Sequence, residues 1–114
     1  MLNSILCGEN VLCVSNEIIE EYTEILQRLF SSEFADTFIK ALLESRFVEL
    51  ITPYYHFNLI KTDPDDNKFV DCAIAANARY VVTNDRHFDI LKQIQFPHVT
   101  IISLMDFLNQ ITNR

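Results

Sequence analysis

The sequence predicts a single α/β domain over residues 1–114, with a mostly parallel sheet covered by helices on both faces. Short apolar segments are separated by longer segments of helical periodicity, as in chains whose strands are joined by helices. The short segments are apolar throughout rather than alternating, which is typical of strands buried on both faces. Hydrophobic residues make up 49% of the chain, which is enough for one core.

The chain opens on a segment that resembles the end of a helix, because Ile5 and Leu6 would fill its last turn and Gly8 would cap it. An apolar run at 11–14 then predicts a strand. Ser15 follows this strand and is suited to cap the next helix, because its hydroxyl can accept a hydrogen bond from a free backbone N–H.

The segment 16–30 has the apolar period of an amphipathic helix. Most of its acids lie on the solvent side, but Glu21 falls only roughly 60° from the centre of the apolar stripe. Glu21 is therefore the acid of this helix that lies nearest to the core. The stripe consists of Ile18, Ile19, Tyr22, Ile25, Leu26 and Leu29.

A second helix is expected from about 32 to 45, where Phe34 and Phe38 lie at a spacing that packs both into the core. The apolar run at 47–51 predicts another strand, and Pro53 then interrupts regular structure.

The stretch 63–88 contains the most unusual placement of acids. A helix is expected to begin at Asp65 or Asp66, and apolar residues follow Asp66 at the helical spacings of three, four and seven. Asp66 would therefore share the buried face of that helix. The β-branched strand expected at 80–83 places Asp85 just beyond its carboxyl end, where open α/β sheets bind ligands.

The remaining chain supplies three further elements. Phe88, Leu91 and Ile94 indicate a short helix, and the run at 99–102 indicates the last strand. Ser103 resembles the first residue of a capping box that opens a terminal helix. The residues expected to face inward from that helix are Leu104, Phe107, Leu108 and Ile111.

Composition excludes several classes of function. Sixteen acids against nine bases give a formal charge of −7, which argues against non-specific binding of nucleic acid through a basic face. A nuclease remains compatible with this charge, because a carboxylate-bound cation can recruit phosphates. The one glycine rules out a glycine-rich phosphate loop, and the chain contains no GxSxG motif.

Cysteine spacing and hydropathy indicate the compartment. Cys7, Cys13 and Cys72 lie in apolar settings without the spacing of zinc ligands, so we expect free buried thiols. No apolar run approaches the roughly 20 residues of a membrane span, and the amino terminus does not resemble a signal peptide. We therefore expect a cytoplasmic protein.

Glu21, Asp66 and Asp85 form the predicted site, with Asp65 as a neighbouring acid. Carboxylates forced together repel one another unless a cation neutralises them. Oxygen ligands of this kind suit Mg²⁺ or Mn²⁺, and the associated chemistry is metal-assisted hydrolysis of a phosphodiester.

Each acid also has a simpler interpretation when it is considered alone. An acid at position 65 or 66 would serve as a helix cap, Asp85 would stabilise a turn, and Glu21 would belong to the edge of an amphipathic helix. His87 is close enough to Asp85 in sequence to line the same crevice, although a solvent-facing histidine is the commoner case.

The segment DPDDNKFVDCAIAANARYVVTNDRHF, together with the upstream VLCVSNEIIEEYTEIL, resembles the PIN-domain family, in particular its toxin components of toxin–antitoxin systems (VapC-like). The resemblance covers essentially the whole chain and implies a PIN-like three-layer sandwich. It also implies a ribonuclease that uses Mg²⁺ or Mn²⁺, acts on RNA, is often neutralised by an antitoxin protein and commonly forms a homodimer.

Matched by position, the second acid of the family falls on Glu21, the third on Asp66 and the fourth on Asp85. Thr83 matches the hydroxyl residue before the fourth acid, and Asn84 lies between the two as a supporting residue.

The chain lacks the first strand of the family, whose Asp-Thr-Asn-like motif supplies the first acid, and most of the first helix. The resemblance places that strand at the centre of the sheet, so we expect the strands at 11–14 and 80–83 to have open edges. Three explanations account for the missing strand: a misplaced start codon, a decayed gene, and a rearranged fold in which a dimer compensates for the strand. We favour the first.

The missing acid motivates an alternative function, a catalytically inactive PIN-like module that binds an antitoxin-like partner. A receiver-like phosphoacceptor domain is a third and weaker hypothesis, because the chain shows neither the acid pair nor the late lysine that such a domain needs.

Overall fold

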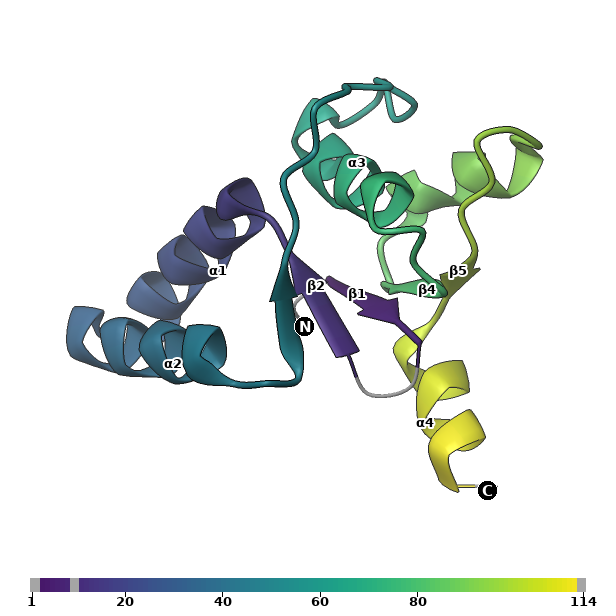
Figure 1. Cartoon of the computed structure of the whole chain (residues 1–114). Coiled ribbons are helices and arrows are strands. Elements are labelled where there is room, and N and C mark those ends of the chain that lie inside the picture. Colours follow the sequence, from purple (N-terminus) through teal and green to yellow (C-terminus); the bar gives the residue numbers. More distant parts are fainter. Residues whose placement is uncertain (1–2, 9–10, 113–114) are drawn as a thin grey trace.

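The computed structural model describes residues 3–8 and 11–112. Within these residues the strands form one sheet, and helices surround it (Figure 1). The strands are β1 (Ser4–Cys7), β2 (Val11–Val14), β3 (Val48–Leu50), β4 (Tyr80–Val82) and β5 (Ile101–Ile102). The helical elements are α1 (Asn16–Leu29), α2 (Ser32–Glu44), the 3₁₀ helix η1 (Pro64–Asp66), α3 (Asn67–Ala75), the 3₁₀ helix η2 (Arg86–Gln93) and α4 (Leu104–Thr112).

The sheet has the strand order β3-β2-β1-β4-β5. Its outer pairs, β2 with β3 and β4 with β5, are parallel. The central strand β1 runs antiparallel to both of its neighbours, with Ile5 opposite Cys13 on one side and Val81 on the other. The α/β prediction is confirmed, and its mostly parallel sheet is refined to a mixed sheet with an antiparallel centre.

The predicted helix end at the start of the chain is wrong, because Ile5 and Leu6 lie in β1. Ile5 is completely buried, and the backbone of β1 pairs on both sides. Gly8 has a φ of 63°, so its left-handed conformation serves the turn after β1 rather than a helix cap. Pairing with two strands decides the conformation of a short apolar segment that its own periodicity leaves ambiguous.

The strands at 11–14 and 80–83 do not have the expected open edges. β1 lies between β2 and β4 and pairs with both, so it fills the central position that the sequence left vacant. β2 begins and ends where predicted, and β4 ends one residue earlier, at Val82.

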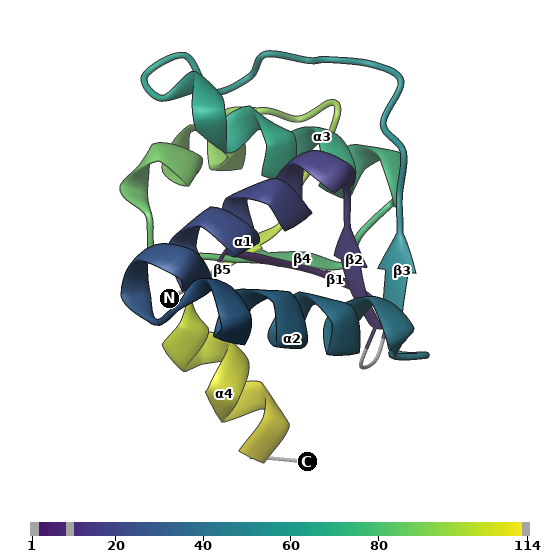
Figure 2. The ribbon, with the colours of Figure 1, turned by 90° about the vertical axis from the view of Figure 1, so that its left-hand side faces the viewer.

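Helices cover the sheet from two sides. α3 packs against β1, β2 and β4, and α1 packs between α2 and α3. α3 and α4 lie on opposite sides of the sheet in both ribbon views (Figures 1 and 2). The core between α3, α1 and the sheet includes the fully buried Ile5, Ile18, Phe69, Val70, Val81 and Phe88.

Two predicted inward faces are exposed instead. In α2, Phe34 is 44% exposed and Phe38 is 39% exposed, and Ala35 is the residue of this helix that is buried. In α4, Leu108 and Ile111 are also exposed. Helical periodicity identifies an apolar stripe but does not determine whether another element packs against it.

The expectation of three free thiols is corrected for two of them. Cys7 and Cys13 are joined as a disulfide that links β1 to β2, and these strands lie side by side at the centre of the sheet. Cys72 is a free thiol in the core, as predicted. Burial raises the pKa of the Cys72 thiol to about 12, so it stays protonated at neutral pH.

Among the residues that the structure describes, no helix has both the length and the apolar character that crossing a membrane requires.

Candidate metal centre

Side chains of α3 hold the loop that leads from β3 to the site. The Asn67 side chain accepts a hydrogen bond from the Ile60 N–H at 2.9 Å and donates one to the Ile60 carbonyl at 2.8 Å. Asp71 accepts a hydrogen bond from the Phe57 N–H, and its carboxylate lies 3.1 Å from Nδ1 of His56. These two contacts hold the loop against α3, and they account for the burial of the Asp71 carboxylate by a structural role.

Asp66 lies at the junction between η1 and α3. The predicted helix start at 65 or 66 is a 3₁₀ turn, and the α-helix begins at Asn67. Asp63 caps the 3₁₀ turn, because its Oδ1 accepts a hydrogen bond from the Asp65 N–H at 3.3 Å. Asp66 makes no side-chain capping bond, so the simple capping interpretation does not account for its carboxylate.

Asp66 is buried, as its position on the apolar face of the predicted helix led us to expect, and this burial changes the pKa of its carboxyl. The residue is 8% exposed. Loss of hydration raises its pKa from 3.8 to about 6, and the nearby charges of Asp85 and Asp63 add to the increase. The hydrogen bond with His87 opposes this shift. A buried carboxyl next to two other acids is the arrangement that a cation would stabilise.

The carboxyl end of β4 positions Asp85. Thr83 is buried, and its hydroxyl donates to Oδ1 of Asn3 at 2.8 Å while it accepts from the Asp85 N–H at 3.0 Å. Asp85 caps η2 through a hydrogen bond from the His87 N–H at 2.9 Å. Asn84 instead accepts a bond from the Leu104 N–H, so it anchors the start of α4.

His87 lies at the point where three carboxylates meet. Its Nδ1 is 3.2 Å from Oδ2 of Asp66 and 3.2 Å from Oδ1 of Asp85. The same nitrogen is 3.5 Å from Oδ2 of Asp63. One ring nitrogen carries at most one proton, so it can satisfy only one of the three acids by hydrogen bonding.

These residues fit a divalent cation. Asp63, Asp66 and His87 each offer a ligand atom, and these atoms all lie within 4.8 Å of one another. In an octahedral site with bonds of about 2.1 Å, neighbouring ligand atoms are about 3 Å apart and opposite ones about 4 Å apart. Asp63 and Asp66 would therefore hold the ion from the η1 side, together with His87. Asp85 does not belong to this close group, and it would face the ion from the end of β4.

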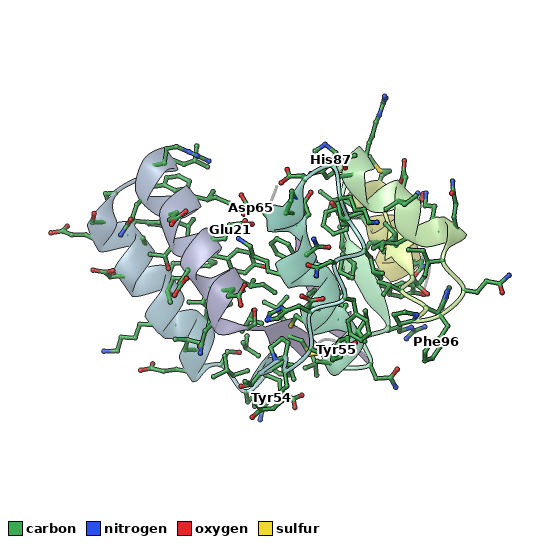
Figure 3. The ribbon with its side chains drawn as sticks, turned by 90° about the horizontal axis from the view of Figure 1, so that it is seen from above. Glu21, Tyr54, Tyr55, Asp65, His87 and Phe96 are labelled. Carbon is green, nitrogen blue, oxygen red and sulfur yellow. A yellow bond between two sulfur atoms is a disulfide. The ribbon has the colours of Figure 1, made fainter. Side chains whose placement is uncertain are left out.

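Glu21 and Asp65 lie on the neighbouring side of the site. Glu21 Oε1 accepts a hydrogen bond from Lys68 Nζ at 3.0 Å. Burial lowers the pKa of Lys68, but Glu21 and then Asp65 raise it by more, so it lies above its usual value. Both acids therefore act on the Lys68 ammonium, and Figure 3 shows Glu21, Asp65 and His87 in the view from above.

The predicted acids therefore fall into two neighbouring groups. Asp66 and Asp85 converge on His87, whereas Glu21 is paired with Lys68. Sequence reasoning missed Asp63 and treated His87 as a residue that more often faces solvent. The signal for Asp63 is its spacing of three from Asp66, because residues three apart are eclipsed on a 3₁₀ turn.

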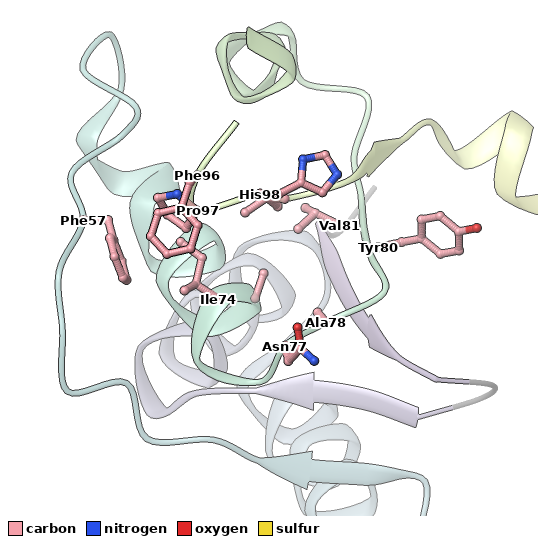
Figure 4. Close-up of a pocket in the computed structure, with 11 residues that line it drawn as sticks. Phe57, Ile74, Asn77, Ala78, Tyr80, Val81, Phe96, Pro97 and His98 are labelled. Atoms are coloured by element: carbon pink, nitrogen blue, oxygen red, sulfur yellow. The ribbon is translucent and has the colours of Figure 1, made fainter. Parts of the chain in front are cut away.

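A separate cavity lies near the opposite end of β4. Its volume is about 340 Å³, and its lining includes Phe57, Ile74, Tyr80, Phe96 and His98 (Figure 4). No acid is among the residues that line it, so it does not belong to the acidic site.

Comparison with known protein families identifies a match. The family model described as "PIN domain" matches residues 1–87, a span that includes all three converging carboxylates and His87. Searches of curated proteins and of solved structures return no significant match.

Proposed function

The chain belongs to the PIN-domain family, and from this membership we propose that it is a metal-dependent endoribonuclease of the toxin type. It would hydrolyse RNA phosphodiester bonds with Mg²⁺ or Mn²⁺ held by carboxylates. The observation that carries the proposal is the convergence of Asp63, Asp66 and Asp85 on one point beyond the end of β4. The proposal includes a cytoplasmic location.

The carboxylates have distinct parts in this proposal. Asp66 is the buried anchor, and Asp85 is the more exposed ligand that faces incoming substrate. A bound divalent cation lowers the pKa of its water and stabilises negative charge on the phosphate. Glu21 completes the acid set named by the resemblance, and its approach to the ion requires release of the ion pair with Lys68.

The charge of the chain fits recruitment of RNA through the site. With a net charge of −7, general attraction of a polyanion is unfavourable. Binding therefore depends on the cation, and we expect RNA binding and cleavage to be lost together when the cation is removed.

Cleavage of RNA in the presence of Mn²⁺ is the direct test. We expect the purified chain to cut single-stranded or structured RNA, and we expect both EDTA and the Asp66→Asn substitution to abolish the cleavage. Asp36→Asn is the matched control, because Asp36 is an exposed acid of α2. Cleavage that persists in EDTA or in Asp66→Asn would show that this site is not responsible.

A specific surface favours the alternative, an inactive PIN-like module that binds an antitoxin-like protein. Phe30, Phe34 and Phe38 form a row at the junction of α1 and α2, with ring centroids 4.7 and 6.1 Å apart. All three are exposed. Exposed aromatic rows are typical of protein interfaces. Metal-dependent hydrolysis that is lost in Asp66→Asn would rule out the inactive module.

The proposal also assigns the chain to the toxin subfamily and assumes a site without the first acid of the family. The position at which the resemblance places the acid-bearing strand is occupied by β1, whose four residues Ser4–Cys7 include no acid. We therefore propose an active site built from the remaining acids.

A further inference from the structure

We propose that His87 is a direct ligand of the cation through Nδ1, and that its imidazole shifts the preference of the site from Mg²⁺ towards Mn²⁺. The inference rests on the proposed function, because it concerns the same site. It assigns a ligand that neither the family match nor the spacing of the acids names.

The geometry around Nδ1 is that of a shared ligand sphere. Its distances to the carboxylate oxygens of Asp66, Asp85 and Asp63 are 3.2, 3.2 and 3.5 Å. Atoms that share one octahedral ion are about 3 Å apart when they are neighbours. The nitrogen therefore lies at the spacing that common coordination requires from the oxygens of Asp66 and Asp63, and these three atoms also lie within 4.8 Å of one another.

The backbone fixes the histidine on the side of the acids. The His87 N–H donates to Oδ1 of Asp85, so the residue begins η2 directly beside the carboxyl end of β4. The side chain is 44% exposed, which leaves room for an ion and its waters at the mouth of the site. By contrast, Nδ1 of His56 contacts the carboxylate of Asp71, which is held in α3.

An ordinary hydrogen bond explains only part of this arrangement. A single proton on Nδ1 would bridge to one carboxylate and leave the other two without a partner of opposite charge at that point. A divalent cation bound by the nitrogen and by the oxygens of Asp63 and Asp66 compensates both of these carboxylates and lies next to Asp85.

The choice of metal follows from the chemistry of the donor. Mg²⁺ strongly prefers oxygen ligands, whereas imidazole nitrogen suits transition metals. Carboxylates alone hold either Mg²⁺ or Mn²⁺. Adding one imidazole therefore raises the affinity for Mn²⁺ more than the affinity for Mg²⁺.

The test combines calorimetry with pulsed electron paramagnetic resonance of the Mn²⁺-loaded chain at pH 8. We expect modulation from an imidazole nitrogen in the native chain and its loss in His87→Asn, which keeps a hydrogen-bond donor near the position of Nδ1. We also expect the ratio of Mn²⁺ to Mg²⁺ affinity to fall at least roughly tenfold in His87→Asn.

Two controls identify the histidine. The chain has three histidines, so the double variant His56→Asn/His98→Asn leaves His87 as the only one. Nitrogen modulation must persist in this double variant. The double variant also keeps the inference testable if His87→Asn does not fold.

The outcomes separate this inference from the proposed function. If Mn²⁺ binds without imidazole modulation, His87 is not a ligand, and the carboxylate-bound nuclease still stands. If neither Mn²⁺ nor Mg²⁺ binds and no RNA is cut, both the inference and the proposed function fail.

Discussion

At the scale of single residues, Asp66 links the stability of the chain to its proposed function. In the absence of a cation its buried carboxylate is unfavourable, and its pKa in the native state is about 6 rather than 3.8. The native state therefore binds the proton more tightly than the unfolded state. The resulting stabilisation is complete below about pH 4 and is lost as the pH rises through 6.

The first prediction concerns this pH dependence. In EDTA, Asp66→Asn should raise the free energy of unfolding at pH 7.5 by on the order of 2 kcal/mol, because the amide cannot ionise. The gain should shrink several-fold at pH 4, where Asp66 is protonated in both states. Urea unfolding followed by circular dichroism measures both values, and Asp36→Asn should show neither effect.

Addition of Mn²⁺ at pH 7.5 should make the wild-type chain more stable than Asp66→Asn, which reverses the order of their free energies of unfolding in EDTA. The cation binds the native wild-type chain and stabilises it by mass action, whereas Asp66→Asn has lost its buried ligand. If Mn²⁺ stabilises both proteins equally, Asp66 is not a ligand.

The second prediction concerns Thr83, whose hydroxyl holds the backbone of Asp85. Thr83→Val preserves the shape of the side chain but leaves the Asp85 N–H without its partner. We expect a loss of about 1 kcal/mol in stability and a roughly tenfold loss in Mn²⁺ affinity. Thr112→Val, which removes an exposed hydroxyl in α4, should leave the Mn²⁺ affinity measured by calorimetry unchanged.

Local spacing was sufficient to predict two of the acids that meet in the candidate site. Asp66 was identified because the helical period placed it with apolar residues, and Asp85 because it follows a buried strand. The convergence on His87 was not predictable in the same way. This convergence depends on the relative position of the turn before α3 and the turn after β4 in the folded chain. The apolar period of each segment does not determine that relative position.

At the scale of elements, β1 is the unexpected feature. Four residues are too few to distinguish a strand from the end of a helix by periodicity. Their conformation is determined by β2 and β4, which each offer a backbone edge to β1. The longer helices α1 and α2 were predictable as helices from their apolar period, but the buried face was predictable only for α1, because the apolar residues Phe34 and Phe38 of α2 are exposed.

The third prediction tests the central position of β1. Ile5→Ala should destabilise the protein by about 2 to 4 kcal/mol, because Ile5 is fully buried and the truncation leaves a cavity. Leu50→Ala is the comparison, since Leu50 lies in the edge strand β3 and is largely exposed. If urea unfolding gives equal losses for the two variants, β1 does not occupy the centre of the sheet in solution.

At the scale of the whole molecule, the exposed aromatic row of Phe30, Phe34 and Phe38 is the clearest candidate for contact with another chain. The resemblance to toxin-type relatives leads us to expect a homodimer. Burying this row in a dimer interface would stabilise the dimer by roughly 25 cal/mol for each Å² of apolar surface that is removed from water.

The fourth prediction is that light scattering will give the mass of a dimer, and that Phe34→Lys will shift the protein towards the mass of a monomer. Thr37→Lys adds the same charge to an exposed position on the same helix and should leave the dimer intact. A monomeric wild-type chain, or equal effects of the two lysines, would exclude a dimer formed through this row.

The order of strands also determines when the site is complete during synthesis. β1 is made first, but one of its two partners, β4, is made after β2, α1, α2, β3 and α3. A chain still on the ribosome can pair β1 with β2 long before Asp85 has been added. Under the proposed nuclease function, we therefore expect that a growing chain holds only part of its ligand set and leaves the messenger and the ribosomal RNA beside it uncut until the sheet has closed.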